Sequence, residues 1–403
     1  MLFRRLLPFL QENPSLALFA LLATASSGFG QTFLLGLFGD QIREAFDLSH
    51  SAYGLTYSLA TLCSAALLLR FGSLLDRWSL SRVTLMALMV LSAGCLMLGL
   101  SRYLWMLALG FLLVRFGGQA MLSHIGMTTA GRYFTRHRGK VVAFGASGFP
   151  LSEALLPLLI AALVASVGWR GSWMVSAGIV LAVLLPCMLW LSHNATHPQA
   201  TTGNGSSDSP GWTRAEVLRD RGFYLLLPAS LAVPFIVTAL FFHQGAITAL
   251  KGWSLEEFAR AFLSYGAGHL ASLLLAGILI DRVGAQRLLP FSLMPLLASL
   301  VVLGISGAIW APWLFLGLLG LSQGAMNATL GALWPERYGV RHIGAIRSVM
   351  QAIMVFSTAL APVALGLLLD TGTGITGLTI LLASYTTGSI LLASLVRRPG
   401  LAG

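Results

Sequence analysis

The chain has 403 residues, of which 56% are hydrophobic and only 10% are charged, and its mean hydropathy is +0.81. So much apolar surface cannot be hidden in a soluble core, which excludes an ordinary soluble protein and favours an integral membrane protein. The net charge of +11 does not indicate a nucleic-acid partner, because most of the 25 Lys and Arg residues gather in segments that one topology places in the cytoplasm.

Roughly twelve apolar runs follow one another, each near the ~20 residues that cross a ~30 Å hydrocarbon layer. They predict an all-α membrane protein whose two termini lie in the cytoplasm, as in a bacterial inner (cell) membrane. The first run has no small-residue cleavage site, so a retained helix is expected rather than a signal peptide. The predicted spans are 16–38, 52–70, 83–101, 103–128, 141–165, 172–192, 222–248, 257–280, 288–308, 311–333, 347–369 and 375–396.

A polar segment, "SHNATHPQATTGNGSSDSPGW", interrupts the apolar pattern between the sixth and seventh runs. Its Ser, Thr, Gly and Pro content is typical of a flexible linker. Thr213 and Glu216 follow with the spacing of a capping box, which predicts a short surface helix. The predicted domains are therefore a six-helix bundle at 1–192, a cytoplasmic linker with a short helix at 193–221, and a second six-helix bundle at 222–403.

An internal repeat supports this division. "GSLLDRWSLSR" begins at Gly72 and "GILIDRVGAQR" begins at Gly277, an offset of 205 residues. The same offset relates "RYFTRH" at Arg132 to "RYGVRH" at Arg337, and also Pro157 to Pro362. One register that fits several separate segments predicts two similar halves, and six helices in each half make them parallel repeats.

Each copy of the loop motif ends a span on the cytoplasmic side. The glycine permits close helix approach, and the carboxylate can cap a neighbouring helix or pair with an arginine. We interpret the two loops as a conformational latch, with a plain topology anchor as the alternative. The predicted latch residues are Gly72, Asp76, Arg77 and Arg82, with their second copies Gly277, Asp281, Arg282 and Arg287.

Four charged or titratable residues inside the spans occur in one half only. Counting about 1.5 Å per residue places three of them near the bilayer midplane and His243 nearer the outside. A charge at that depth is costly, so it should face protein or water and have a partner, and Arg115 and Glu153 are natural partners. We predict a substrate or proton site, with structural pairing or packing as the alternative. The candidate residues are Arg115, Glu153, His243 and His269.

The motifs closely resemble those of the major facilitator superfamily, and the resemblance covers essentially the whole chain. "GSLLDRWSLSR" is similar to that family's loop after its second helix, although Ser79 replaces the usual glycine, and "RFGGQAM" is similar to its fourth-helix motif, with Arg115 as the arginine. The resemblance implies two pseudo-symmetric six-helix bundles, twelve transmembrane helices in all. It also implies a central cavity that opens to each side in turn, without ATP.

A narrower resemblance links "RYFTRHRGKVVAFGASGFPLSEALLP" to the monocarboxylate and oxalate/formate type porters. Those monocarboxylate porters carry an aspartate and an arginine in the eighth helix. This chain has His269 and Leu273 at those places, so their substrate-binding arginine is absent.

Together these features predict a secondary transporter that moves a small organic solute across the membrane, coupled to protons. An organic anion or monocarboxylate is the first candidate for that solute. Proton-antiport efflux of drugs is the nearest alternative, and a membrane sensor that does not transport is the alternative from another class. The sequence has no "GxxxxGK[ST]" loop and no "HExxH" motif, so neither enzyme activity nor a cofactor or metal is expected. The expected partners are the solute, protons and the lipid bilayer, and the protein is expected to be a monomer.

Overall fold

The structure is a computed structural model that describes residues 13–134, 138–193 and 211–396. Within these ranges the chain is helical and has no strand, and one isolated bridge joins Gly211 to Gly339. By length and composition, nine of the described helices could cross a membrane, or ten if the bent pair Pro14–Gly30 and Thr32–Phe46 counts as one span. The all-α membrane architecture predicted from the sequence is confirmed.

Two described segments account for the difference from the expected twelve spans. Arg138–Ser192 counts as one stretch of 55 residues, although Gly168 has a φ of +71° and breaks its helix. The 28-residue helix Ala311–Tyr338 is long enough to cross, but it falls outside the count because Gln323 and Asn327 in its middle lower its hydropathy. The structure is therefore consistent with twelve spans.

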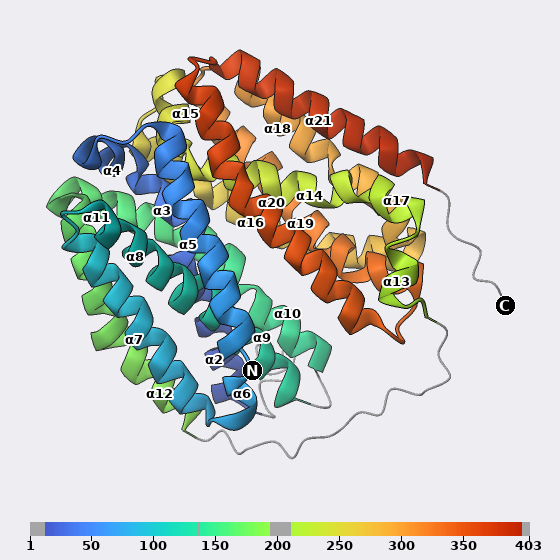
Figure 1. Cartoon of the computed structure of the whole chain (residues 1–403), viewed down its shortest axis with the longest axis horizontal. Coiled ribbons are helices and arrows are strands. Elements are labelled where there is room, and N and C mark those ends of the chain that lie inside the picture. The colour runs from blue at the N-terminus through green and yellow to red at the C-terminus, as the bar shows by residue number, and fades with distance from the viewer. Residues whose placement is uncertain (1–12, 135–137, 194–210, 397–403) are drawn as a thin grey trace, which may run out of the picture. The chain divides into compact units, whose positions relative to one another are not determined.

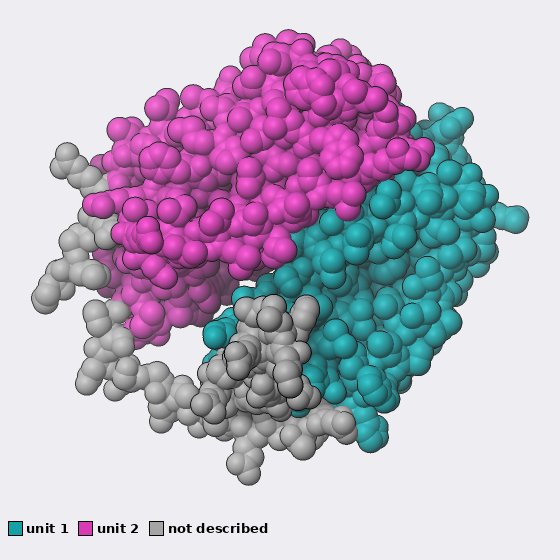
Figure 2. All heavy atoms as spheres, turned by 180° about the vertical axis from the view of Figure 1, so that it is seen from behind, with its two compact units in different colours: residues 1–201 teal, residues 202–403 magenta. Residues whose placement is uncertain are grey.

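The chain separates into two compact units, residues 1–201 and 202–403, which Figure 2 colours separately. The predicted division into 1–192, 193–221 and 222–403 stays a prediction, and most of the predicted linker lies outside the described residues. The capping box is confirmed: Thr213 Oγ1 accepts the N–H of Glu216, whose carboxylate accepts the N–H of Thr213 at 2.6 Å.

In unit 1 the long helices pack side by side, with α5 against α8, α8 against α7, and α7 against α11 and α12 (Figure 1). The first apolar run is not one regular helix, because it is interrupted at Gln31 and again near Gly36. Its helices are α2 (Pro14–Ser26), η2 (Ser27–Gly30), α3 (Thr32–Leu35), η3 (Gly36–Phe38), α4 (Gly39–Phe46), α5 (His50–Phe71), α6 (Leu74–Arg77), α7 (Leu80–Gly99), α8 (Leu104–Val114), η4 (Arg115–Leu122), α9 (Ser123–Arg132), α10 (Arg138–Ala146), α11 (Gly148–Ile179), η5 (Val180–Leu184) and α12 (Leu185–Ser192).

In unit 2 the most extensive contact joins the two helices α16 and α19. A Cβ at Gly320 would lie 2.1 Å from the carbonyl oxygen of Tyr265, and one at Gly324 would lie 2.1 Å from that of His269. Small residues allow this approach of two backbones. The helices are α13 (Arg214–Val217), α14 (Arg221–Phe242), α15 (Gln244–Lys251), α16 (Leu255–Val283), α17 (Ala285–Ser292), α18 (Met294–Ile305), α19 (Ala311–Tyr338), α20 (Ile343–Asp370) and α21 (Ile375–Leu395).

Gly324→Ala is expected to destabilise unit 2 by about 1–3 kcal/mol, because the new methyl group would press on rigid backbone rather than on a flexible side chain. Gly331 on the same helix is the matched control, since a Cβ there meets nothing within 4 Å. Gly331→Ala should be neutral or slightly stabilising, because alanine favours helix. Equal loss of stability in both variants, measured by unfolding in mixed micelles, would contradict the close packing.

Candidate functional site

The first candidate region begins where the first apolar run is interrupted. Helix η2 ends at Gly30, and Gln31 adopts an extended conformation with φ −81° and ψ 153° before α3 starts at Thr32. The two helical segments on either side are bent by 40°. The interruption leaves the Gly30 carbonyl oxygen to accept a hydrogen bond from Arg115 Nη1 at 3.0 Å. Broken helices of this kind mark the binding regions of many transporters.

Arg115 lies where a second helix departs from α geometry. It is the first residue of η4, an eight-residue π-helical stretch between α8 and α9. π-Helical turns inside long helices are frequent at functional sites. A Cβ at Gly30 would lie 2.2 Å from the Val114 carbonyl oxygen, so only glycine lets the two irregular segments meet at this distance. The backbone of the interrupted helix is thereby brought within reach of the arginine.

The guanidinium of Arg115 is buried, with only 5% of the residue exposed. Its guanidinium carbon lies 5.0 Å from the centre of the Tyr57 ring, and the Tyr57 hydroxyl is 2.6 Å from Thr32 Oγ1. Within the described part of the chain, the Nε–H of Arg115 has no hydrogen-bond partner. The carbonyl and the ring face stabilise the positive charge in part, but neither neutralises it.

Glu153 lies half-buried on α11, one residue after Ser152. The Ser152 side chain approaches Gly28, so α11 packs against the same short helix η2 whose last carbonyl binds Arg115. The interactions described for Arg115 are with Gly30 and Tyr57, and its pairing with Glu153 stays a prediction.

The two histidines of unit 2 are both buried, each with 3% of the residue exposed. His243 joins α14 to α15, and its Nε2 is 2.7 Å from the carbonyl oxygen of Pro362 on α20, which requires that nitrogen to donate. His269 lies on α16, with its Nε2 3.1 Å from Nδ2 of Asn327 on α19. Their part in substrate or proton binding stays a prediction.

Three neighbours of these residues were missed at the sequence level: Tyr57, Gln323 and Asn327. The 205-residue offset pairs them with Phe262, Gly118 and Leu122, so each polar group occurs in one half only. A comparison of the halves that included uncharged polar residues, as well as charged ones, would have selected all three.

Where α5 ends in unit 1, the predicted latch contains an exposed ion pair. The Asp76 carboxylate pairs with Arg132 Nη2, and Arg132 Nη1 donates to the Leu75 carbonyl oxygen at 2.8 Å. The Gly72 carbonyl oxygen is 3.2 Å from His124 Nε2. Arg77 and Arg82 are exposed. This half of the latch therefore joins the end of α5 and the short α6 to α9.

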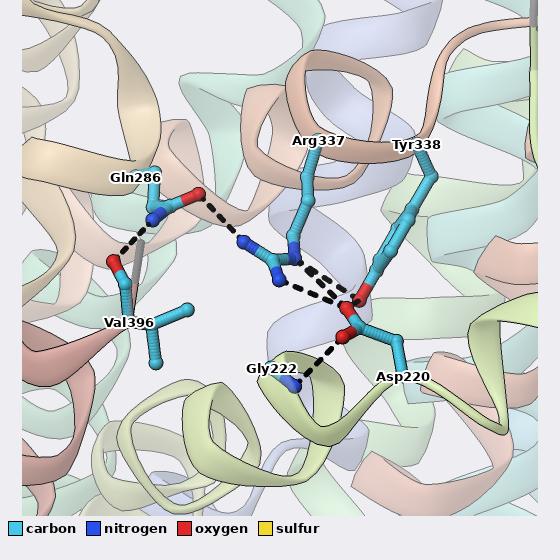
Figure 3. A network of polar contacts seen from close by, with 6 residues as sticks. All are labelled: Asp220, Gly222, Gln286, Arg337, Tyr338 and Val396. Atoms are coloured by element: carbon cyan, nitrogen blue, oxygen red, sulfur yellow. Dashed lines mark hydrogen bonds and ion pairs between the residues drawn. The ribbon is translucent and has the colours of Figure 1, made fainter. Parts of the chain in front are cut away.

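Unit 2 does not repeat that pair. Arg337, the counterpart of Arg132, pairs instead with Asp220, whose Oδ2 is 2.9 Å from Nη2 (Figure 3). The second copies of the latch residues, Gly277, Asp281, Arg282 and Arg287, are exposed. Within the described residues, the repeated sequence motif therefore has different ion-pair partners in the two halves, and the latch function stays a prediction.

The Asp220–Arg337 pair belongs to a buried polar network, drawn in Figure 3. The Tyr338 hydroxyl donates to Asp220 Oδ2 at 2.7 Å, and the Gly222 N–H donates to Oδ1 at 2.9 Å. Arg337 Nη1 donates to Gln286 Oε1 at 3.0 Å, and Gln286 Nε2 donates to the Val396 carbonyl oxygen at 2.8 Å. The network joins the start of α14, the start of α17, the end of α19 and the segment after α21.

The network also sets the protonation of Asp220. Burial raises the pKa of this carboxyl, but hydrogen bonds from Tyr338, Arg337 and the Gly222 N–H outweigh burial, and the pKa lies below its ordinary 3.8. Only 3% of the Arg337 side chain and 15% of the Asp220 side chain are exposed. Asp220 is therefore ionised at neutral pH and is fully used as a hydrogen-bond acceptor.

An all-α membrane fold in which an interrupted helix meets a second, irregular helix is typical of membrane transporters. The chain belongs to the Major Facilitator Superfamily, whose family model matches residues 20–362. The predicted resemblance and the all-α class of fold are thereby confirmed, with the described helices consistent with twelve spans, and the protein is a transporter and not an enzyme.

Known relatives agree with this assignment. The chain is 24% identical over 344 residues to the uncharacterized MFS-type transporter YcxA of Bacillus subtilis (strain 168), covering 81% of each chain. It is 23% identical over 245 residues to an MFS-type transporter of Gibberella moniliformis (strain M3125 / FGSC 7600), covering 59% of this chain and 56% of that one.

Solved structures share the fold. A bacterial homologue of the human lysosomal transporter Spinster, inward-facing and unoccupied, matches with a TM-score of 0.67 at 16% identity, covering 94% of this chain and 93% of that one. The occupied inward-facing form of such a homologue matches with a TM-score of 0.68 at 14% identity, covering 93% and 92%.

Proposed function

We propose that this transporter moves a small organic anion, a monocarboxylate first, across the bacterial inner membrane by proton-coupled alternating access. The observation that carries the proposal is the guanidinium of Arg115, which is buried at mid-helix against the Gly30 carbonyl oxygen and the Tyr57 ring. Its Nε–H has no hydrogen-bond partner among the described residues. A buried cation whose charge is only partly compensated favours an anionic ligand. A carboxylate matches the planar fork of the guanidinium and can accept two hydrogen bonds from it.

A carboxylate that binds Arg115 would have to displace the Tyr57 ring, which is held in place by Thr32. The Tyr57 ring lies across the guanidinium, and its hydroxyl is held by Thr32 directly after the helix interruption. An entering carboxylate would exchange the ring contact for an ion pair, and the freed hydroxyls could bond the ligand. Substrate binding would thus pull on the segment between η2 and α3, whose extended residue Gln31 is a ready point of bending.

Proton coupling is assigned to Glu153 on α11. In the proposed cycle, the carboxylate that binds Arg115 adds a negative charge to the region in which Glu153 lies, since α11 packs against η2. Glu153 then takes up a proton, because two carboxylates near one cation are unfavourable. Substrate and proton would cross the membrane together. After both have left, the empty carrier would reorient so that its binding site opens again to the first side.

The test is uptake of labelled carboxylates by proteoliposomes, with and without an inwardly directed proton gradient. Uptake above that of protein-free vesicles, stimulated by the gradient, is expected for at least one monocarboxylate. Lipophilic cations in the same assay test the alternative of drug efflux. Expulsion of those cations with no carboxylate flux would overturn the proposal.

Glu153→Gln is expected to abolish gradient-driven net uptake while exchange of internal for external substrate survives. The glutamine amide resembles the protonated carboxyl group, so the substrate-loaded carrier can still reorient and exchange continues. Because the amide neither binds nor releases a proton, the proton gradient can no longer drive net uptake. Both fluxes are measured on one vesicle preparation. Net uptake at the wild-type rate in this variant would show that Glu153 does not couple transport to protons.

A further inference from the structure

A hydrogen-bonded chain of three side chains lies between α16 and α19. Asn327 Nδ2 is 3.1 Å from His269 Nε2, and Gln323 Nε2 donates to Asn327 Oδ1 at 3.2 Å. The two amides lie one turn apart on α19. The backbones of α19 and α16 come close together on the same stretch, at Gly320 and Gly324.

The chain runs from a buried group to exposed ones at mid-helix depth. His269 is 3% exposed and is the fifteenth of 29 residues in α16, whereas Asn327 is exposed and is the seventeenth of 28 in α19. Gln323 is partly exposed. Exposed carboxamides at this depth are unfavourable against lipid tails, so they should face a water-filled cavity.

The direction of the hydrogen bonds follows from the groups themselves. An amide nitrogen can only donate, so His269 Nε2 accepts from Asn327 and carries no proton. Asn327 Oδ1 is occupied by Gln323, which leaves Gln323 with its carbonyl oxygen and one N–H for other partners. In this state Gln323 offers an acceptor and a donor.

A proton on His269 Nε2 would reverse the direction of both hydrogen bonds. That nitrogen must then donate, so the Asn327 amide has to turn and present its oxygen. Its nitrogen would next donate to the Gln323 oxygen, which leaves Gln323 with two N–H donors for other partners while its oxygen already accepts from Asn327. The partly exposed Gln323 side chain would then offer two N–H groups to an anion.

We propose that Asn327 and Gln323 belong to the binding site and that protonation of His269 raises the number of N–H donors that Gln323 offers to a substrate from one to two, which favours an anionic substrate. The proposal deepens the proposed function and rests on it for the substrate class. It supplies a second way for proton binding to favour anion binding, through neutral amides rather than through Glu153.

The charged groups on the elements that pack around His269 lie toward helix ends, so the proton that operates this switch is assigned to the histidine. Tyr265, one turn earlier on α16, places its ring 6.2 Å from the imidazole. The charged residues of α16 and of the elements that pack on it lie toward helix ends, and the nearest on α16, Arg260, is about 13 Å away along the axis. They are Glu256, Glu257, Arg260, Asp281 and Arg282 on α16, Glu336 and Arg337 with the phenol of Tyr338 on α19, Arg287 on α17, Lys251 on α15 and Arg221 on α14.

The switch is tested by nuclear magnetic resonance of the full chain in nanodiscs, with ¹⁵N in histidine rings and glutamine side chains. Between about pH 5 and pH 8, where imidazoles titrate, the Gln323 amide signals are expected to move with the same midpoint as the His269 ring nitrogens. Gln286, held by Arg337 and Val396, is the internal control and should not follow.

The variant Asn327→Leu breaks the chain while leaving both ends in place. His269 should still titrate, and the Gln323 signals should no longer follow it. The proposal is overturned if Gln323 follows equally well in this variant, if it stays fixed in the wild type while His269 titrates, or if His269 does not titrate at all.

Access to the cavity is tested with Asn327→Cys in a background without the three native cysteines. A charged methanethiosulfonate reagent should react at least about tenfold faster with this cysteine than with Leu274→Cys, because charged reagents avoid hydrocarbon. Leu274 is 58% exposed and lies five residues after His269, about 140° around α16. Equal rates would place Asn327 against lipid and overturn the proposal.

Failure of this proposal and failure of the proposed function give different results. If no carboxylate is transported but Gln323 follows His269, the switch stands and the substrate class is wrong. If gradient-driven carboxylate uptake is found but Gln323 does not follow His269, the transport function stands and the switch is wrong.

Discussion

Arg115→Gln is expected to reduce gradient-driven uptake of a confirmed carboxylate substrate by at least about 30-fold, because truncation of a buried charge pair costs upwards of 2 kcal/mol. Glutamine keeps an N–H donor for the Gly30 carbonyl oxygen but removes the positive charge and the fork of donors. Arg115→Lys should retain measurable uptake with a weaker apparent affinity, since lysine keeps the charge without the planar geometry. Initial rates in proteoliposomes measure both effects.

Arg170 offers a matched control in the same unit. Its guanidinium also donates to a backbone carbonyl, that of Ser101 at 3.1 Å, and also lies over an aromatic ring, that of Trp169 at 4.3 Å. Because Arg170 lies between the predicted spans 141–165 and 172–192, Arg170→Gln should leave uptake near the wild-type rate. A normal rate in Arg115→Gln, or an equal loss in both variants, would contradict a substrate role for Arg115.

Asp220→Asn is expected to lower the free energy of unfolding of unit 2 by about 3–5 kcal/mol, because it leaves the Arg337 guanidinium buried without its counter-ion. The amide would also lose the carboxylate that accepts from both Arg337 and Tyr338. Unfolding in mixed micelles can be followed by tryptophan fluorescence, since Trp212 and Trp334 lie 5.4 and 6.2 Å from the Tyr338 ring.

The same substitution at the other Asp–Arg pair is the control. Asp76 is 62% exposed and Arg132 is 34% exposed at the side chain. Asp76→Asn should therefore cost only about 0–1 kcal/mol, since exposed ion pairs are well solvated. Equal costs at the two sites would show that the buried network of Figure 3 does not stabilise unit 2.

The pH dependence has a definite sign. The pKa of Asp220 is lower in the folded protein than its ordinary 3.8, so its contribution is complete above about pH 4 and is lost as the pH falls through the lower folded value. Acid should therefore destabilise the wild type more than Asp220→Asn over that window. Parallel acid curves for the two proteins would contradict the assignment.

Much of this fold could be predicted from local features of the sequence. Runs of apolar residues long enough to cross a bilayer, and a repeat at 205 residues, predicted the helical class and the superfamily resemblance. The capping box at Thr213 was likewise predicted, because it depends only on residues three apart. Burial of Arg115 was also expected, since the residue interrupts an apolar run.

The partners of the polar residues could not be predicted in the same way. The repeat relates Arg132 to Arg337 and Asp76 to Asp281, yet Arg132 pairs with Asp76 whereas Arg337 pairs with Asp220, more than a hundred residues away. The same holds for Arg115, whose expected neighbour was Glu153 and whose described contacts are Gly30 and Tyr57. Neither contact has a signature in the local pattern.

Hydropathy and helical period determined by themselves that the chain enters a membrane and where its helices run, because each depends on neighbours within a few turns. Tertiary structure alone decided which polar groups meet. Glycines at positions such as 30, 320 and 324 let backbones approach closely, and this packing brings one carbonyl or amide, and not another, within about 3 Å of a buried side chain.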